Sequence, residues 1–307
     1  MKITVLGDLL YDCFIWAPRL PRMGETVTGD RNGFYAGGKG GNQAVQCARL
    51  GAEVSMIGKV GVDSRGDFLL ENLRREGIRT EYVFREGETG TCCVHVDHAG
   101  HNAIIVAPLA NETMRVEEVR RAEAQITASD ILLVQLQVNE EAVTEALKIA
   151  ARAGVRTVLN PAPARAVPES YFDLVEFWTP NETEAEFFTG CAQNGQAPEV
   201  WCRTAAECLR SKGARNVIIT LGEHGCFYSG AEGEALVPPY PVNAVDSTAA
   251  GDSFNAAFCV ALAEGRPLPE ALLRGNAAGA LTASRHGSQP SMPDRQALET
   301  MMRRKEP

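Results

Sequence analysis

The sequence lacks three features that would narrow its function class at once: a basic stripe, a long apolar run and a cysteine framework. Its 307 residues carry a formal net charge of −9, and no stretch concentrates lysine and arginine. A chain without such a patch has no electrostatic footprint for nucleic acid, so local groups must hold any anionic substrate. No window approaches the ~18 apolar residues of a membrane span. We therefore expect neither a nucleic-acid partner nor a membrane partner.

The nine cysteines form no CxxC pair and no repeating spacing. This pattern is typical of reduced, mostly buried thiols, and it predicts a cytoplasmic protein. His95, His98 and His101 are three residues apart, but on a predicted hairpin they would not share one face, so no metal site is expected there. The start, MKITVLGDLLYDCFIWA, resembles a signal peptide. Asp8 and Asp12 interrupt its apolar run, however, and its β-branched residues favour a first strand.

What the chain contains is an alternation of apolar strands and amphipathic helices. Hydrophobic residues make up 45% and charged residues 22%, as in ordinary globular proteins. Strands are predicted at 2–6, 54–60, 131–136, 155–159, 174–178 and 217–221. Helices are predicted at 42–50, 64–76 and 140–152, closed by Gly51, Gly77 and Gly154. This alternation predicts an α/β fold, Rossmann-like, with a mostly parallel central sheet flanked by helices.

Two stretches break the alternation, at residues 12–35 and 91–106. The first contains the turn-rich PRLPRMGE and the strand-like TVTGDRNGFY. The second contains two runs of alternating polar and apolar residues on either side of 97–101, which predicts a β-hairpin. We expect them to form a small β-sheet lid near the carboxyl ends of the parallel strands, where ligands bind in such sheets. Residues 1–11, 36–90 and 107–307 would then form the body that binds nucleotide and substrate.

The segment GFYAGGKG (33–40) comes close to a Walker A loop. Gly40 stands where Ser or Thr would bind magnesium, and the segment follows the insert rather than a core strand, so we reject a P-loop. What remains, GGKGGNQ, is a glycine-dense approach to the predicted helix at 42–50. Backbone amides, Lys39 and Asn42 could reach a polar ligand together there. A tight connection with a solvent-exposed lysine is the alternative interpretation.

Two later segments allow both a structural and a functional interpretation. In TPNETEAE (179–186), Asn181 and Glu184 can form a capping box. They can also face hydrated magnesium and phosphates, since oxygen ligands suit this hard cation. In ITLGEHGC (219–226), Thr220, Gly222 and Gly225 follow a strand end, which suits a nucleotide-contacting loop as well as an ordinary turn.

The segment DSTAAGDSFNAAF (246–258) places two aspartates around a run of small residues. Apolar residues at helical spacing from 254 to 262 predict a buried helix that starts near 251–252. A helix start offers unpaired N–H groups and the positive end of the helix dipole, which favour an anion. Ala249, Ala250 and Gly251 would let a ligand approach the backbone closely. Asp252 either caps this helix or acts on a ligand bound there.

Together these motifs resemble the signatures of the ribokinase-like (PfkB) carbohydrate kinases. GGKGGNQAVQCARLG is similar to the N-terminal signature, and DSTAAGDSF is similar to the C-terminal one. NPAPA (160–164), TPNETEAE, ITLG and the late GSQPSMP resemble motifs of the ribose-phosphorylating members in the same order, so the resemblance covers nearly the whole chain. It implies an α/β body with a β-sheet lid, ATP and Mg²⁺. The reaction it implies is transfer of the γ-phosphoryl group to a sugar hydroxymethyl group, converting D-ribose to ribose 5-phosphate.

The resemblance also implies roles for single residues. Asp252 would be the general base, and the amides of Ala249, Ala250, Gly251 and Asp252 would form an anion hole for the phosphoryl group. The residues implied for the sugar are Asp12, Gly38, Lys39, Asn42, Gln137 and Asp252. Those implied for the nucleotide are Asn181, Thr220, Gly222, Gly225, Gly251 and Asn276. Glu184 would hold Mg²⁺ through water, and a K⁺ site would consist of Asp246, Thr248, Ala283 and Ser291.

The sequence departs from this pattern near the expected sugar site. Leu10 stands where ribose-phosphorylating bacterial members often carry Asn, Gln137 where they carry Glu, and Leu109 where glycine is usual. Leu10 cannot hydrogen-bond and Gln137 carries no charge, so we expect a weaker hold on ribose. Deoxyribose, a ketohexose or a nucleoside remains an alternative substrate, and a non-catalytic sugar-sensing relative remains an alternative class. The lid carries Phe14, Trp16 and Phe34, and we expect its unpaired edges and apolar faces to be exposed in a monomer, which predicts a homodimer joined through the lid.

Overall fold

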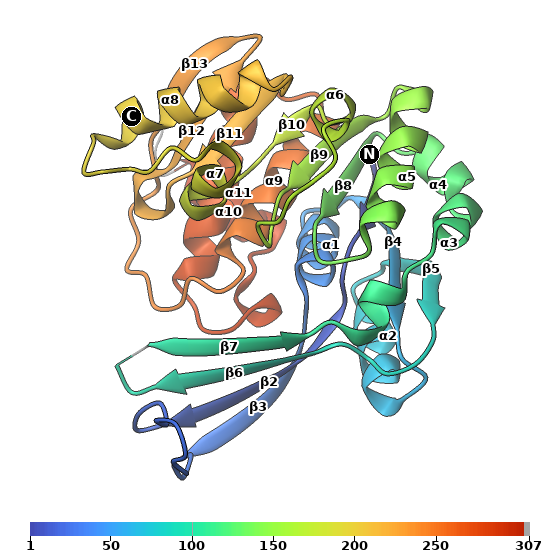
Figure 1. Ribbon diagram of the computed structural model, residues 1–307, viewed down its shortest axis with the longest axis vertical. Coiled ribbons are helices and arrows are strands. Elements are labelled where there is room, and N and C mark those ends of the chain that lie inside the picture. The colour runs from blue at the N-terminus through green and yellow to red at the C-terminus, as the bar shows by residue number, and fades with distance from the viewer. Residues whose placement is uncertain (100, 304–307) are drawn as a thin grey trace.

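The centre of the protein is a nine-stranded sheet with helices on both faces (Figure 1). A computed structural model describes residues 1–99 and 101–303. Residue 100, in the predicted hairpin turn, and residues 304–307, at the end of the predicted body, lie outside the described residues. The strand order is β13-β12-β11-β10-β9-β8-β1-β4-β5. The β11–β12 and β12–β13 pairs are antiparallel, and the other pairs are parallel.

The strands of this sheet are β1 (Lys2–Leu6), β4 (Glu53–Val60), β5 (Arg79–Arg85), β8 (Ile131–Gln135), β9 (Arg156–Asn160), β10 (Phe177–Trp178), β11 (Asn216–Thr220), β12 (Cys226–Gly230) and β13 (Gly233–Val237). Successive side chains of a strand point to opposite faces. Ile131 and Leu133 of β8 therefore join one apolar core, and Leu132 and Val134 join the other. The predicted parallel α/β sheet covered on both faces is confirmed.

Each core is closed by its own set of helices. The first is covered by α1 (Lys39–Arg49), α2 (Ser64–Arg75), α9 (Ala250–Ala263), α10 (Leu268–Ala283) and α11 (Arg295–Arg303). The second is covered by α3 (Val116–Arg121), α4 (Glu123–Thr127), α5 (Glu140–Ala153), α6 (Tyr171–Leu174), α7 (Glu182–Thr189) and α8 (Pro198–Ser211). Three short 3₁₀ turns, η1 (Leu109–Thr113), η2 (Gly222–His224) and η3 (Gln289–Ser291), lie in connections. None of the described helices is both long and apolar enough to cross a bilayer.

Local signals set most of the predicted helix ends. Asp63 caps α2 by accepting a hydrogen bond from the amide of Gly66, and Gly154 ends α5 with a φ of 69°. The predicted strand at 174–178 is wrong in its first half, because the chain forms α6 before the two-residue strand β10. The helical turn brings the ring of Phe172 onto Trp178, with centroids 4.6 Å apart, and thereby buries both rings.

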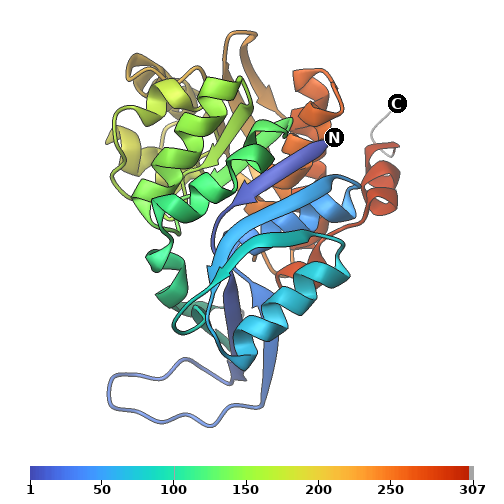
Figure 2. The ribbon, with the colours of Figure 1, turned by 90° about the vertical axis from the view of Figure 1, so that its right-hand side faces the viewer.

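A separate four-stranded sheet forms the lid and projects from one end of the body (Figure 1). Its order is β3-β2-β6-β7, with β2 (Leu10–Ala17), β3 (Arg31–Gly37), β6 (Thr91–Asp97) and β7 (Asn102–Ala107). The β6–β7 pair is antiparallel, which confirms the predicted hairpin. In the first insert, residues 18–30 contain no strand and extend beyond the sheet, so the predicted strand begins only at Arg31 (Figure 2).

In the two central strands of the lid sheet, β2 and β6, side chains on one face are more buried than those on the other. On the inner face, Leu10 and Phe14 are 3% exposed, and they pack against Cys92 and Val94. The expectation that Phe14 contributes an exposed apolar surface is therefore wrong, because it lies between Trp16 and Tyr35 on the covered face. On the outer face, Phe34 is 49% exposed and Ile105 is 69% exposed. These two do leave apolar surface uncovered.

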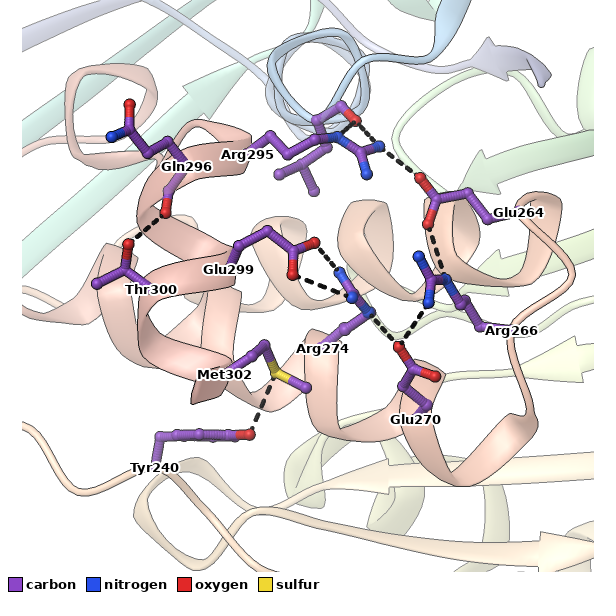
Figure 3. Close-up of polar contacts among 11 residues, drawn as sticks. Tyr240, Glu264, Arg266, Glu270, Arg274, Arg295, Gln296, Glu299, Thr300 and Met302 are labelled. Atoms are coloured by element: carbon purple, nitrogen blue, oxygen red, sulfur yellow. Dashed lines mark hydrogen bonds and ion pairs between the residues drawn. The ribbon is translucent and has the colours of Figure 1, made fainter. Parts of the chain in front are cut away.

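The C-terminal helix α11 is fastened to the helices beneath it by ion pairs (Figure 3). Arg274 of α10 donates to Glu270 at 3.0 Å and to Glu299 of α11 at 2.7 Å. Arg295 contacts Glu264, which follows α9, at 2.6 Å, and its Nε donates to the carbonyl of Leu50 at 2.8 Å. Because Leu50 is the C-cap of α1, this network joins the far ends of α1 and α9.

Candidate active site

The polar residues of the site lie where the strand order of the large sheet reverses. From β1 the chain adds β4 and β5 on one side, and it adds β8 and the later strands on the other. Loops diverge at such a switch point and leave a crevice at the carboxyl ends of the strands. Asp8 follows β1, Gln135 ends β8 and Asn160 ends β9. The starts of α1 and α9 meet at this position.

The glycine loop before α1 is held by Asp8. Gly38 is the N-cap of α1, with a φ of 84°, and it has no side chain to cap the helix. Asp8 supplies the acceptors instead: its Oδ1 accepts from the amide of Gly40 at 2.9 Å, and its carbonyl accepts from the amide of Gly41 at 3.0 Å. The helix therefore begins at Lys39, three residues before the predicted start. This arrangement places Lys39 and Asn42 in the first turn, facing α9.

The start of α9 is built as a donor site. Ala249, its N-cap, has a φ of 62°, and the amide of Ala250 donates to the carbonyl of Ser247 at 3.1 Å. Within the described part of the chain, the amides of Ala249, Gly251 and Asp252 have no backbone acceptor. A Cβ at Gly251 would meet nothing within 4 Å, so the backbone there is open to a ligand. Three of the four amides predicted for an anion hole, those of Ala249, Gly251 and Asp252, are thus free to donate to one.

The Asp252 side chain lies buried beside these amides. Its Oδ2 accepts from Nδ2 of Asn42 at 2.9 Å, and its Oδ1 accepts from Nε2 of Gln43 at 2.9 Å. Burial raises the pKa of Asp252, while the charge of Lys39 and these two hydrogen bonds act against the rise. Asp252 does not cap its own helix, since α9 has no side-chain cap. The carboxylate is instead oriented by two side chains of α1.

Two more carboxyl groups come close to Asp252. Burial, and then the charges of Asp8 and Asp252, raise the pKa of Asp12 to about 8. Burial also raises the pKa of Asp8 to about 6, against the hydrogen bond from Gly40 and the charge of Lys39. Asp12 lies over Gly37, where a Cβ would approach its Oδ2 to 2.0 Å. Asp8 is fully buried and Asp12 is 7% exposed, so only Asp12 retains some accessible surface, and its contact with a sugar stays a prediction.

A cleft extends from Asp252 along the ends of β9, β10 and β11. The predicted residues that line it are Lys39, Asn181, Glu184, Thr220, Ala249, Gly251 and Asp252. Asn181 and Glu184 form the capping box of α7, with Glu184 Oε2 accepting from the amide of Asn181 at 2.8 Å. Burial raises the pKa of Glu184, against the hydrogen bond from Asn181. The capping interpretation is confirmed, and the same carboxyl group also faces the cleft.

Three residues predicted for the nucleotide, Gly222, Gly225 and Asn276, do not line this cleft and lie near β12 and β13 instead. Gly222 opens η2 with a φ of 52°. A Cβ at Gly225 would lie 2.1 Å from the carbonyl of Val237, so close packing alone requires glycine there. Asn276 is buried in α10 and donates to the carbonyls of Val237 and Pro238, at 3.2 and 3.1 Å. These contacts hold the segment after β13, and nucleotide contact by the three residues stays a prediction.

Three of the four residues predicted for a monovalent cation come together beside α9. The amides of Val245 and Asp246 both donate to the carbonyl of Ala283, at 2.8 and 3.2 Å. The Asp246 carboxylate accepts from the amides of Thr248 and Gly287, each at 2.9 Å. Although burial raises the pKa of Asp246, these hydrogen bonds hold it below its usual range. Ser291 is fully buried in η3, where its hydroxyl donates to the carbonyl of Ser288 at 2.6 Å.

The structure also brings in residues that the sequence analysis did not assign to the site. Gln43 contacts Asp252 directly, Gln135 donates to Gln43, and Asn160 accepts from Gln43 at 3.1 Å. A signal for Gln135 was present, because it is a polar residue in the buried apolar run of β8, at its carboxyl end. Asn160 occupies the same place in β9. For Gln43 the sequence contained no signal beyond its position after Asn42.

The three residues that differ from the family pattern near the expected sugar site, Leu10, Leu109 and Gln137, have different surroundings. Leu10 lies two residues before Asp12 on β2, and therefore on the same face of the lid, inside the apolar cluster. Leu109 has a φ of 47° and is 41% exposed, so a conformation that favours glycine is occupied by a branched residue. Gln137 is half-buried in the turn after β8. Its contact with a sugar stays a prediction.

The fold and site define an α/β kinase with a β-sheet lid, and comparison with known proteins identifies its family. Residues 1–295 match the pfkB family of carbohydrate kinases. The chain belongs to this family and is an ATP-dependent carbohydrate kinase. Ribokinase of Haemophilus influenzae is 40% identical over 296 residues, which is 96% of each chain.

Two solved structures are similar over almost their whole length. Ribokinase from Thermotoga maritima is 34% identical with a TM-score of 0.88, covering 98% of this chain and 99% of its own. Ribokinase of Arabidopsis thaliana, solved in complex with ribose and ATP, is 29% identical with a TM-score of 0.88, covering 98% of both chains. The family resemblance of the sequence motifs is thereby confirmed.

Proposed function

We propose that this kinase transfers the γ-phosphoryl group of ATP to the hydroxymethyl group of D-ribose, with Asp252 as the base. The observation that carries this proposal is the Asp252 carboxylate, buried and oriented by Asn42 and Gln43 beside the free amides of α9. The similarity to ribokinases over nearly the whole chain supports ribose as the acceptor.

The geometry suggests how the reaction proceeds. A sugar hydroxyl placed between Asp12 and Asp252 would be oriented by carboxyl groups on both sides. The amides of Gly251 and Asp252 would receive the negative charge that spreads over the transferred phosphoryl oxygens. Lys39 lines the same cleft and supplies a positive charge next to Asp252. Asp252 would accept the hydroxyl proton as the bond to phosphorus forms.

The cleft fits ATP with Mg²⁺, and the loop beside it fits a monovalent cation. Glu184 is a buried carboxyl group facing the cleft, and Mg²⁺ commonly keeps several waters between itself and such a group. The carboxylate of Asp246 and the carbonyl of Ala283 are oxygen ligands that lie together, because the amide of Asp246 donates to this carbonyl, and Asp246 precedes the anion-binding amide of Gly251 by five residues. K⁺ held there with Thr248 and Ser291 would stabilise the backbone that presents those amides. We expect turnover to rise when K⁺ replaces a large organic cation at constant Mg²⁺.

A second candidate acceptor is a pentose that lacks one hydroxyl, such as deoxyribose. It is supported by Leu10 and Cys92, two buried apolar neighbours of Asp12 on the inner face of the lid. A hydroxyl pressed against these side chains would have no partner, which disfavours the more hydroxylated sugar. A ketohexose or a nucleoside has no comparable observation in its favour, and the intact Asp252 arrangement argues against a non-catalytic sensor.

We propose that two chains pair through their lids and that the protein works in the cytoplasm. The exposed Phe34 and Ile105 on the outer lid face support pairing, since both would be covered by a second sheet. The division into a lid (12–35 and 91–106) and a body belongs to the same proposal.

Free thiols at all nine cysteines support the cytoplasmic location. Light scattering at micromolar concentration tests the dimer, and a monomeric mass would contradict it.

ADP release tests the catalytic proposal. We expect release with ATP, Mg²⁺ and D-ribose, and a screen with deoxyribose, ketohexoses and nucleosides ranks the acceptors. Asp252→Asn should bind ATP but lose about 100-fold or more in turnover, the low end for removing a positioned base. Asp67→Asn, which changes an exposed carboxylate of α2, is the matched control and should keep its turnover. Near-normal turnover of Asp252→Asn would refute the base, and ADP release with another acceptor but not ribose would refute the substrate.

A further inference from the structure

We propose that Gln43 and Gln135 are positioning residues that act in series, Gln135 on Gln43 and Gln43 on Asp252, to orient and stabilise the carboxylate base. The inference rests on the proposed role of Asp252. It adds to that role two buried glutamines whose side-chain amides form a directed chain of hydrogen bonds ending at the carboxylate.

Both glutamines are fully buried, and their contacts cross from the sheet to the helices. Gln135 ends β8, and its Nε2 donates to Oε1 of Gln43 in α1. Nε2 of Gln43 donates both to Oδ1 of Asp252, at 2.9 Å, and to Oδ1 of Asn160 at the end of β9, at 3.1 Å. The chain therefore links β8, β9, α1 and α9 at the point where the sheet order reverses.

The direction of each amide follows from its partners. A carboxylate can only accept, so Gln43 must present its NH₂ group to Asp252. The Oδ1 of Asn160 accepts from the same NH₂ group, while Nδ2 of Asn160 donates to the carbonyl of Thr179 at 3.4 Å. The Oε1 of Gln43 is then left with one partner, the NH₂ group of Gln135. If Gln135 did not donate, the amide of Gln43 could turn and place its oxygen against the carboxylate.

The chain matters because Asp252 has mostly unfavourable surroundings for a negative charge. It is buried, and the carboxyl groups of Asp8 (after β1), Asp12 (β2) and Glu184 (α7) interact with it. The groups that favour its ionised form are Lys39 and Asn42, at the start of α1, and Gln43. Hydrogen bonds to an ionised carboxylate are stronger than those between neutral groups. Removing the donor at residue 43 should therefore raise the pKa of Asp252 and loosen its orientation.

The test is Gln43→Met, which keeps the length and burial of the side chain but removes the amide. We expect kcat to fall about 10- to 100-fold, the usual range for one hydrogen bond to a charged group. In the pH profile of kcat/KM, the acid limb should move to higher pH by about one unit. The KM for ATP should stay within about twofold, since Gln43 does not line the nucleotide cleft. Gln135→Met should shift the limb in the same direction by a smaller amount.

Gln46→Met is the matched control. Gln46 is on the same helix and is equally buried. It donates to the carbonyl of Pro293 at 3.0 Å and accepts from the hydroxyl of Ser253 at 3.4 Å, but it has no hydrogen bond to the carboxylate of Asp252. Any general loss of packing should appear in both variants, whereas the shifted acid limb should appear only in Gln43→Met. An acid limb that moves equally in both, or in neither, would overturn the inference.

A measurement without turnover separates this inference from the proposed function. In protein labelled with ¹³C at aspartate carboxyl carbons, the Asp252 signal is the one lost in Asp252→Asn. The midpoint of its titration should lie at higher pH in Gln43→Met than in the wild type or in Gln46→Met. An unshifted titration overturns the role of Gln43 even if Asp252→Asn is inactive. A shifted titration supports it, and near-normal turnover of Asp252→Asn would then refute the base alone.

Discussion

Gly38 provides a quantitative test of how the glycine loop is built. Its φ of 84° and ψ of 141° lie in a region that is essentially reserved for glycine. A Cβ at this residue would lie 2.8 Å from the carbonyl oxygen of Asp8, 2.8 Å from its Oδ2 and 2.9 Å from the amide of Leu10. Two of these three atoms belong to the backbone and cannot rotate away. Gly38→Ala therefore adds a conformational strain and a steric overlap.

The expected loss of stability is the sum of the two terms. The unfavourable backbone region costs about 1–3 kcal/mol, and overpacking adds about 1–3 kcal/mol, so the free energy of unfolding should fall by about 2–6 kcal/mol. Gly154→Ala is the control, because Gly154 has a φ of 69° but nothing within 4 Å of a Cβ. It should lose about 1–2 kcal/mol from backbone strain alone.

Urea unfolding of the two variants measures this difference. Because Asp8 must move in Gly38→Ala, its hydrogen bond to Gly40 should weaken, and the KM for the sugar should rise in this variant but not in Gly154→Ala. Equal losses of stability in the two variants would refute the steric part of the reasoning. An unchanged sugar KM in a destabilised Gly38→Ala would show that the loop position does not govern sugar binding.

Three further predictions concern other parts of the protein. Burial raises the pKa of Asp12 to about 8 in the folded protein, above its value of about 4 in the unfolded chain. The stability that proton binding at Asp12 contributes is therefore lost as the pH rises from about 4 to about 8. Asp12→Asn should flatten this decline in urea unfolding measured across that range, and parallel curves for mutant and wild type would contradict the shift. Arg274→Leu removes the buried partner of Glu270 and Glu299, so it should lower the free energy of unfolding by about 2–3 kcal/mol. Arg203→Leu, at a more exposed arginine, should lower it by less than about 1 kcal/mol. Equal shifts in melting temperature for the two variants would refute this distinction. Leu109→Gly should be about 1 kcal/mol more stable than Leu109→Ala, because both lose the side chain but only glycine relieves the φ of 47°, and the reverse order would show that this conformation carries no strain.

The elements of the fold were predictable where a local signal determined them. The β8 run is apolar up to its last residue, Gln135, as expected of a strand buried on both faces. Asp63, Asn181 and Gly154 mark helix ends by their own hydrogen bonds or backbone conformation. Two predictions failed for different reasons. The start of α1 depends on Asp8, which is 32 residues from Gly40, so this contact leaves no pattern within a short window. The contact of Phe172 with Trp178 is local, but a short apolar run does not distinguish a strand from the helical turn of α6.

The candidate site was predicted in part. The glycine loop and the start of α9 could be identified as candidates because a helix start after small residues presents free N–H groups that favour an anion. The pairing of Asn42 with Asp252 spans 210 residues and could not be obtained from spacing. The amide chain through Gln43 and Gln135 was missed, since a buried glutamine has the same appearance in a sequence whether it supports a core or a carboxylate.

By itself, the sequence determined which segments become strands and helices, where the donor-rich helix starts lie, and which carboxyl groups are available, because these depend on residues close together in the chain. The tertiary structure decided which of those groups meet. β1 and β8 lie side by side in the sheet, although the chain between them forms the lid and two further strands of the body. This pairing places Asp8, Gln135 and Asp252 around one crevice. Burial of these groups together then raises the pKa values of Asp8, Asp12 and Asp252, since a charge removed from water is affected by every neighbour that packs against it.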